Sequence, residues 1–335
     1  MAFSVALPEI YRSIDVAWDD AIHRTQFVTR AKAAEICLMN QTANIEPLIE
    51  GVNEDAKTRT VRVHWLNGCA ITDGAVTDEC AAATTELTDA KQDHTLTSTR
   101  EASFKVAWKA GRTTPHMMNQ QVATGMLRAM KALDEYLAVQ MYAFLAANNG
   151  GHEYSLAVGS NSSDVWQIDA TDWNVDLYPQ WVLAADFSHF DNPYLLHGTN
   201  LFAEAFKANQ YQANADGKGE NNLYQTIPSE WDPVGASNAS AAAMSWLINR
   251  SAVALGTGNY FDTAPRQFAG NHRVYKVASK NLPGVFYDVH EMETCTSDEF
   301  VVSYKLNVYF DYFLNPLSCV ATRTGILQFE KVAGV

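Results

Sequence analysis

Two His-Glu pairs are the residues whose types and spacing come closest to a catalytic motif. His152-Glu153 and His290-Glu291 each open the pattern H-E-x-x-H. On a helix, that pattern places two histidines on one zinc ion and a glutamate nearby as general base. The position of the second histidine is leucine in the first pair and threonine in the second. Neither pair therefore predicts a zinc hydrolase.

The other partial motifs also lack residues that their chemistry needs. The Gly-Thr-Gly run at 256–258 has no third glycine, so it does not predict a dinucleotide site. The run DWNVD at 172–176 opens like a calcium loop, but Leu177 and Leu183 stand where glycine and the last glutamate should be. There is no G-x-x-x-x-G-K-[ST] run and no serine in a G-x-S-x-G context. The sequence predicts no catalytic residue, no cofactor and no metal, although catalytic groups can also assemble in space from distant positions.

The cysteines indicate free thiols rather than a disulfide framework. Their number is odd and no C-x-x-C spacing occurs among Cys37, Cys69, Cys80, Cys295 and Cys319. Since disulfides persist mainly in oxidising compartments, we expect a reducing environment. The N-terminal residues have no basic and then apolar run of a signal peptide, and no run of apolar residues is long enough to span a membrane.

Charge argues against one broad class of function. The chain has 335 residues, 47% of them hydrophobic and 19% charged, with a formal net charge of −14. A protein that binds nucleic acid regardless of sequence needs a basic face, so this class is disfavoured. The charge is nevertheless uneven, because the stretch from Arg100 to Lys131 contains six basic residues and one acidic residue.

Two segments with strand periodicity flank a long polar stretch. Residues 58–66 and 101–110 alternate apolar and polar side chains. We expect them to pair as a two-stranded ribbon with an elaborated tip, which needs a surface to lie on because a lone ribbon is barely stable. The apolar positions facing each other would be Val61, Val63 and Trp65 on one strand and Phe104, Val106 and Trp108 on the other.

A long helix and a long strand dominate the rest. Residues 115–147 carry apolar side chains every three or four positions, which predicts a helix of about 50 Å. Gly125 lies inside it and costs about 1 kcal/mol relative to alanine. Residues 299–313 alternate strictly and predict a strand of about 45 Å, matching the helix in length.

Shorter elements lie between and after these two. Strands are predicted at 192–200, 271–279 and 285–294, helices at 201–211 and 236–255, and a last short strand at 325–332. Mixed helices and strands of this kind indicate an α+β or α/β layer, and we expect an α+β fold.

The order of these elements resembles the major capsid protein of tailed bacteriophages, the Hong Kong 97-like capsid fold. That family has an N-terminal arm, an extended β-ribbon loop, a spine helix against a peripheral sheet, an axial domain and strands that return to the periphery. The resemblance covers the whole chain, rests on architecture and carries no diagnostic motif. It implies an arm at 1–51, an extended loop at 52–113, a spine helix of the peripheral domain at 114–149, an axial domain at 150–295 and peripheral return strands at 296–335.

The resemblance implies a structural protein rather than an enzyme. Copies would assemble as hexamers and pentamers into an icosahedral shell, in the host cytoplasm, around double-stranded DNA that is bound without sequence specificity. Portal and decoration proteins would be further partners, with any scaffold a separate protein because no charge-rich leader follows Met1; no membrane is involved. The expected assembly residues are Val61, Val63, Trp65, Arg100, Phe104, Lys105, Val106, Trp108, Lys109 and Arg112.

Three other functions remain open at this stage. A cellular compartment shell of the encapsulin kind would share the fold and enclose a protein cargo. An unrelated α+β enzyme would show a formed pocket with perturbed carboxylates or histidines. A tail or baseplate component would differ in symmetry.

Overall fold

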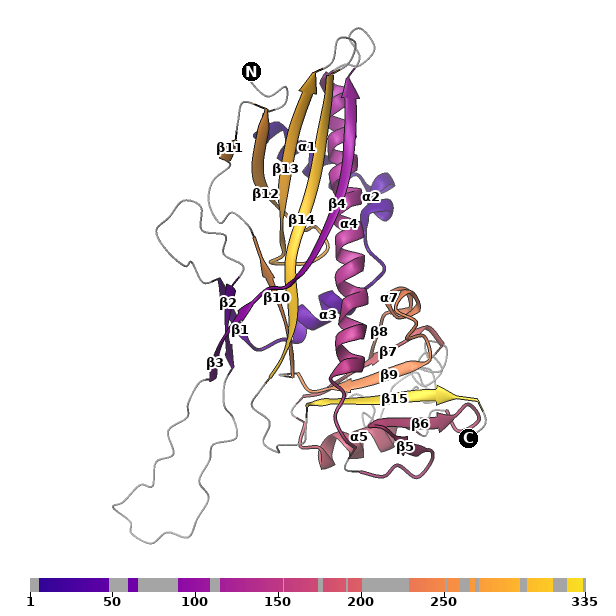
Figure 1. Cartoon of the computed structure of the whole chain (residues 1–335). Coiled ribbons are helices and arrows are strands. Elements are labelled where there is room, and N and C mark those ends of the chain that lie inside the picture. The colour runs from indigo at the N-terminus through magenta and orange to yellow at the C-terminus, as the bar shows by residue number, and fades with distance from the viewer. Residues whose placement is uncertain are drawn as a thin grey trace, which may run out of the picture.

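The fold is built along one helix, α4 (Pro115–Ala147), which runs the length of a six-stranded sheet (Figure 1). A second six-stranded sheet crosses the end of this helix, and a small three-stranded sheet lies to the side. The computed structural model describes residues 6–47, 60–65, 90–108, 115–152, 154–173, 177–190, 192–200, 229–250, 252–259, 266–268, 271–295, 300–315 and 324–333.

Helix α4 has the bounds that its periodicity predicts. Pro115 is its first residue, a position where the missing N–H costs nothing. Helices α1 (Leu7–Asp19) and α3 (Ala33–Asn40) also pack on α4, whereas the side of the helix that carries Gln121 and Arg128 is exposed. The predicted stripe is buried at Val122, Met126, Met130, Leu133, Leu137 and Met141 and partly buried at Phe144.

The first six-stranded sheet is antiparallel throughout and covers α4. Strand β14 (Phe300–Leu314) lies in its middle, and even-numbered residues from Val302 to Tyr312 are buried while odd-numbered ones such as Ser303 are exposed or half-buried. The long alternating strand is thus confirmed. The other members are β4 (Ser98–Trp108), β10 (Val253–Gly258), β11 (Arg266–Phe268), β12 (His272–Ala278) and β13 (Phe286–Cys295).

The second six-stranded sheet has the order β5-β6-β15-β9-β7-β8. Helix α5 (Leu177–Phe187) covers one face, where Trp166, Trp181 and Phe329 form a separate core. The other face joins the main core through Trp246, whose ring lies 5.2 Å from that of Tyr142 on α4. Its strands are β5 (Ser160–Ser162), β6 (Val165–Asp169), β7 (Tyr194–His197), β8 (Ser229–Trp231), β9 (Met244–Ile248) and β15 (Ile326–Val332).

The N-terminal helices lie on the chain's own body. Helix α1 buries Ile10 and Ile14 in the main core, followed by α2 (Ala21–Phe27) and α3. Since α1 contacts α4 of the same chain, the described part of the expected arm does not extend away from its own body. The small sheet then consists of β1 (Asn44–Pro47), β2 (Thr60–Trp65) and β3 (Ala90–Thr95).

The helix predicted at 236–255 is wrong. A short helix, α7 (Pro233–Asn238), ends there and the chain continues as β9 and β10. Both strands are buried on both faces, so their sequences carry no apolar–polar alternation. The strands predicted near 192–200, 271–279, 285–294 and 325–332 are confirmed, and the helix predicted at 201–211 lies outside the described residues.

The predicted pairing of the ribbon is also wrong. Strand β2 pairs with β3 and β1, whereas β4 pairs with β14 in the register Phe104 to Tyr304. The chain switches sheets between β3 and β4, where Leu96 is buried and the Asp311 carboxylate accepts hydrogen bonds from the Thr97 N–H (2.5 Å) and the Ser98 hydroxyl (2.5 Å). Strand β4 is long enough to match β14, so pairing there buries more of its apolar face than a short ribbon would.

The sheets therefore divide the chain differently from the expected domains. Strands β10 to β13 come from 150–295 but pair around β14. Strand β15 comes from 296–335 but lies in the second sheet, between β6 and β9. The reason is that long-range pairing, which no local pattern encodes, decides sheet membership. Mostly antiparallel sheets with helices packed on them make the class α+β.

Candidate assembly surfaces

The apolar face of β2 anchors the small sheet to its own chain. Val61, Val63 and Trp65 are at most 2% exposed and pack against Ala254 of β10 and Phe313 of β14. These three expected assembly residues are therefore not available to a neighbouring molecule. They fix the base of the segment between β2 and β3 to the sheet.

Ion pairing holds the register of this small sheet. Arg62 on β2 faces Asp93 on β3, with Nε to Oδ1 at 2.7 Å and Nη2 to Oδ2 at 2.8 Å. Hydrogen bonds from Arg62 lower the pKa of Asp93. The His94 ring stacks on Phe313 at 4.4 Å between centroids. Together these contacts hold β2 and β3 to each other and to the first sheet.

The apolar residues of β4 also face inward. Phe104 stacks on Tyr304 at 4.9 Å between centroids, and Val106 is 5% exposed. Position 108 faces Phe300 in the β4–β14 register, while nothing is described of the Trp108 side chain. Lys109 and Arg112 lie outside the described residues.

Basic residues are the expected assembly residues that reach the surface in the described part of the chain. Lys105 on β4 is exposed, and so is Arg100, whose guanidinium lies 4.4 Å from the Tyr136 ring centroid. Lys131, at the end of the basic stretch, donates to the backbone oxygen of Gln26 at 3.0 Å. Part of the basic stretch thus holds the chain's own elements together.

An open strand edge lies beside this basic surface. Among the described residues, β14 is the one strand that pairs with β4, so the second edge of β4 is open. A groove of about 720 Å³ runs between this edge and α4. An open edge carries unpaired backbone donors and acceptors that another chain can use. We call this the β4-edge groove; the residues lining it include Lys105, Ala107, Met117, Gln121 and Arg128.

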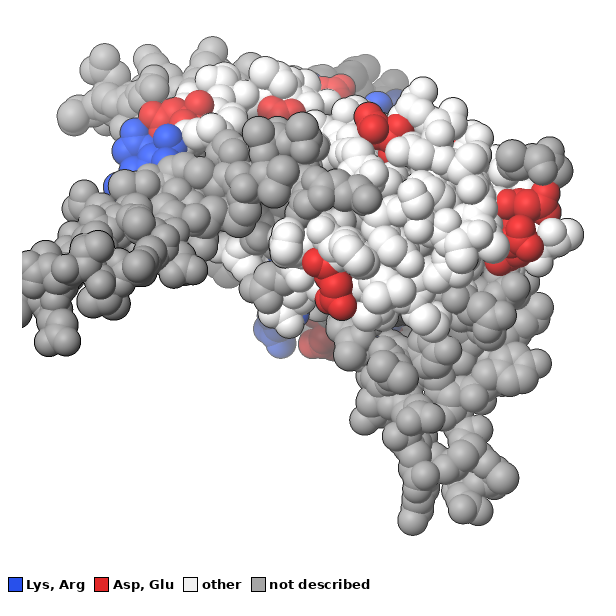
Figure 2. Space-filling view, turned by 90° about the horizontal axis from the view of Figure 1, so that it is seen from below, with Lys and Arg blue, Asp and Glu red and all other residues white. Residues whose placement is uncertain are grey.

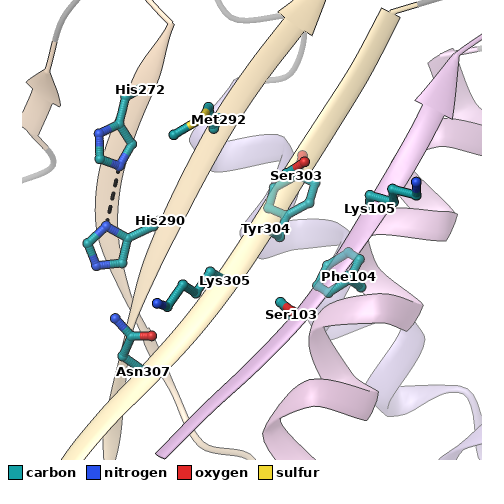
Figure 3. A pocket seen from close by; sticks show the side chains of 10 residues that line it. All are labelled: Ser103, Phe104, Lys105, His272, His290, Met292, Ser303, Tyr304, Lys305 and Asn307. Atoms are coloured by element: carbon teal, nitrogen blue, oxygen red, sulfur yellow. Dashed lines mark hydrogen bonds between the residues drawn. The ribbon is translucent and has the colours of Figure 1, made fainter.

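The outer face of the first sheet carries a second, shallow groove of about 610 Å³ (Figure 3). His272 and His290 lie in it with Met292 and Lys305. Lys305 forms an ion pair with Glu101 across the β4–β14 pair. The groove is therefore only partly cationic.

Two of the partial motifs noted in the sequence do not form sites, whereas Glu153 and residues 174–176 of the other two lie outside the described residues. His290 faces the outer groove, whereas the next residue, Glu291, is buried on the inner face and accepts hydrogen bonds from Arg273. Since the two side chains lie on opposite faces of β13, they cannot act on one ion. Gly256 lies within β10, where a β-carbon would collide with the Phe313 ring. In the described part of the chain, no group of three or more His, Cys, Asp or Glu residues is placed to hold a metal.

A buried carboxylate on α4 is a residue that the sequence analysis did not single out. Asp134 is 1% exposed and accepts hydrogen bonds from Ser279 (3.0 Å), Asn281 (2.8 Å) and Tyr287. Asn281 also accepts from the Thr29 N–H at 3.0 Å, so this cluster joins the N-terminal segment, α4 and the β12–β13 turn. Burial raises the pKa of Asp134 to about 6. The signal in the sequence was an acidic residue on an otherwise apolar stripe.

A second buried carboxylate caps two helices. Asp232 accepts from the N–H groups of Lys32 and Ala33 at the start of α3, each at 2.7 Å. Its other oxygen accepts from the Gly235 N–H at 2.8 Å, at the start of α7. Burial raises the pKa of Asp232, against the lowering effect of these bonds. One side chain therefore ties the N-terminal segment to the second sheet.

The remaining sequence expectations concern thiols, membranes and charge. Cys37 carries a buried free thiol whose pKa burial raises to about 12; Cys295 is exposed, and the other three cysteines lie outside the described residues. No helix of the described residues is long and apolar enough to cross a membrane. Figure 2 shows the molecule from the end formed by the second sheet, where acidic side chains lie at several separate places among uncharged residues.

Comparisons with known proteins give structural matches alone. No protein-family model matches the chain, and no curated protein matches its sequence. The capsid of Ralstonia phage GP4 is 10% identical, with 87% of this chain and 92% of that chain covered and a TM-score of 0.47. The mature capsid of bacteriophage PhiM1 is 11% identical, with 87% and 88% covered and a TM-score of 0.43. A structure from Mycobacterium phage Che8 is 11% identical, with 87% and 93% covered and a TM-score of 0.40. The chain is thus similar over most of its length to bacteriophage structures, two of which are named as capsids.

Proposed function

We propose that this chain is a major capsid protein, which self-assembles into an icosahedral shell around phage double-stranded DNA. The observation that carries the proposal is the 33-residue helix α4 packed lengthwise against β4 and β14. Such a helix and sheet form a rigid, elongated body. Attached to it is a small sheet whose base is locked to the same body by Val63 and Trp65.

This arrangement suits a subunit that contacts many neighbours. A rigid body transmits the position of one contact to another, because packed interiors deform little. The polypeptide between β2 and β3 starts and ends at a base that is fixed to this body. The β4-edge groove offers a neighbour unpaired backbone groups and basic side chains.

The pairing of strands adjusts the proposed domains. The peripheral domain consists of α4 and the sheet around β14, and the axial domain consists of the second sheet with α5 and α7. The arm remains 1–51. Because β4 belongs to the peripheral sheet, the extended loop ends near 97 rather than at 113.

The proposed partners follow from the same assembly. Copies of the chain form hexamers and pentamers, with a separate scaffold, a portal and decoration proteins as further partners. The protein is located in the virion after assembly in the host cytoplasm. A net charge of −14 suits a wall that encloses a dense polyanion without gripping it.

Negative-stain microscopy of the purified full chain tests the proposal. Closed shells, or tubes and sheets made of hexamers, are the expected result. Isolated particles of 37.0 kDa at every protein concentration and salt concentration, with or without virion partners, would contradict it. Mass spectrometry of native particles separates a phage shell, which contains DNA, from a compartment that contains an enzyme.

A further inference from the structure

We propose that His272, His290 and Met292 form a copper-binding site on the outer face of the first sheet. The three side chains line one groove and come from adjacent strands, β12 and β13 (Figure 3). This site is independent of shell assembly, since all three residues belong to one chain.

The spacing of the two histidines fits one metal ion. His272 Nε2 and His290 Nδ1 lie 3.3 Å apart. Two nitrogens bound at about 2.0 Å to one ion at a tetrahedral angle are about 3.3 Å apart. Without metal, one of these two nitrogens donates a hydrogen bond to the other. When the ion binds, the donating ring moves that proton to its other nitrogen, so both rings stay neutral and both facing nitrogens present lone pairs.

The charged neighbour of the two imidazoles is itself paired. Lys305 faces His290 across the β13–β14 pair, but its charge is compensated by the ion pair with Glu101.

The third side chain selects the metal. Met292 faces His272 in the strand register and is 47% exposed. Imidazole ligands suit zinc, copper, nickel and iron, whereas a thioether favours Cu(I). A set of two imidazoles and one thioether in an open groove therefore matches copper best, with a further coordination position open to water.

Copper titration of the full chain, without a tag and treated with chelator, tests the site. We expect one Cu²⁺ per chain by calorimetry, and an electron paramagnetic resonance spectrum with coupling to two nitrogens. His272→Ala and His290→Ala should each lower the affinity at least about 100-fold, because even residues that only support a ligand contribute 10- to 100-fold. His189→Ala, which removes an exposed histidine elsewhere, should leave the affinity unchanged.

A second variant distinguishes the contribution of the thioether to copper binding from that of the imidazoles. Met292→Leu should weaken Cu(I) binding, measured under reducing conditions by competition with bicinchoninate, and leave Cu²⁺ binding nearly unchanged. Circular dichroism checks that each variant is folded. A wild-type chain that binds no copper, or copper affinity that is equal in both histidine variants and in His189→Ala, would overturn the site and leave the shell proposal untouched.

Discussion

The ring of Phe104 on β4 occupies the space that a β-carbon at Gly125 of α4 would need. An added β-carbon there would lie 2.3 Å from the nearest ring carbon. The glycine, which costs helix stability on its own, lets the edge strand of the sheet approach the long helix closely. Strand β4 precedes α4 in the chain, and the two elements pack side by side.

Gly125→Ala should destabilise the chain although alanine is the better helix former. The Phe104 ring must move, and overpacking of this kind costs about 1–3 kcal/mol. Urea unfolding followed by circular dichroism measures the change. The double variant Gly125→Ala/Phe104→Leu should recover part of the loss, and equal losses in the single and double variants would contradict the contact.

Asp134 should give the chain a stability that rises as pH falls towards 4. Burial raises its pKa from 3.8 to about 6, so between these values the folded chain holds a proton that the unfolded chain releases. The contribution of this group to the free energy of unfolding therefore decreases as pH rises from about 4 to 6, by up to roughly 3 kcal/mol, and is constant above. Urea midpoints of the wild type and Asp134→Asn, compared from pH 4.5 to 7.5, isolate the effect. Parallel pH profiles for the two proteins would show that the carboxyl does not titrate as described.

Asp232→Ala should lower the free energy of unfolding by more than the loss of an ordinary helix cap does. The change leaves the N–H groups of Lys32, Ala33 and Gly235 without their acceptor at two helix starts. Hydrogen bonds to charged groups contribute about 1.5–3 kcal/mol, so we expect a loss of about 3 kcal/mol or more. Thermal and urea unfolding measure it, with Asp172→Ala, an exposed aspartate, as the matched control. A loss no larger than in the control would show that water replaces the carboxylate.

Replacing residues 66–89 by Asn-Gly should leave the monomer folded and abolish normal shells. Trp65 faces Ala90 in the β2–β3 register, so a two-residue turn can join them while the anchored base of the sheet stays intact. Melting temperature and circular dichroism should be near those of the wild type. Microscopy should show no closed shells, because the segment proposed to reach a neighbour is gone. Normal shells from this variant would rule out the segment as an assembly element, whereas an unfolded variant would mean that it belongs to the core.

Lys105 and Arg128 should accelerate assembly through their charge. Both line the β4-edge groove and are exposed in a chain of net charge −14. The double variant Lys105→Glu/Arg128→Glu should assemble more slowly than the wild type in light scattering, with an unchanged urea midpoint. Wild-type assembly should also slow as salt rises to about 0.15 M, where screening acts over roughly 8 Å. If the assembly rates of both proteins do not depend on salt, the charges of the β4-edge groove do not accelerate assembly.

The sequence by itself determined the elements whose burial is one-sided and regular. The stripe from Val122 to Met141 predicted α4, and the alternation around Tyr304 predicted β14, because a helix or strand with one buried face shows its period in the side chains. The same logic failed at β9 and β10, which are buried on both faces and whose alanine-rich surroundings favoured a helix. The period of apolar residues reflects which faces of an element are buried, so it predicts helix or strand only where one face is exposed to water.

Only the tertiary structure decided which strands pair and which side chains meet. The alternation of side chains correctly predicted that β2 and β4 are strands. It did not predict that β4 pairs with β14, because the partner of a strand depends on the total area buried over the whole chain. Asp232 reaches Lys32 across 200 positions of sequence, and the His272–His290 contact exists because β12 and β13 lie in one register. Local sequence carries the preference of each segment for helix or strand, whereas contacts between distant segments depend on how all of them pack at once.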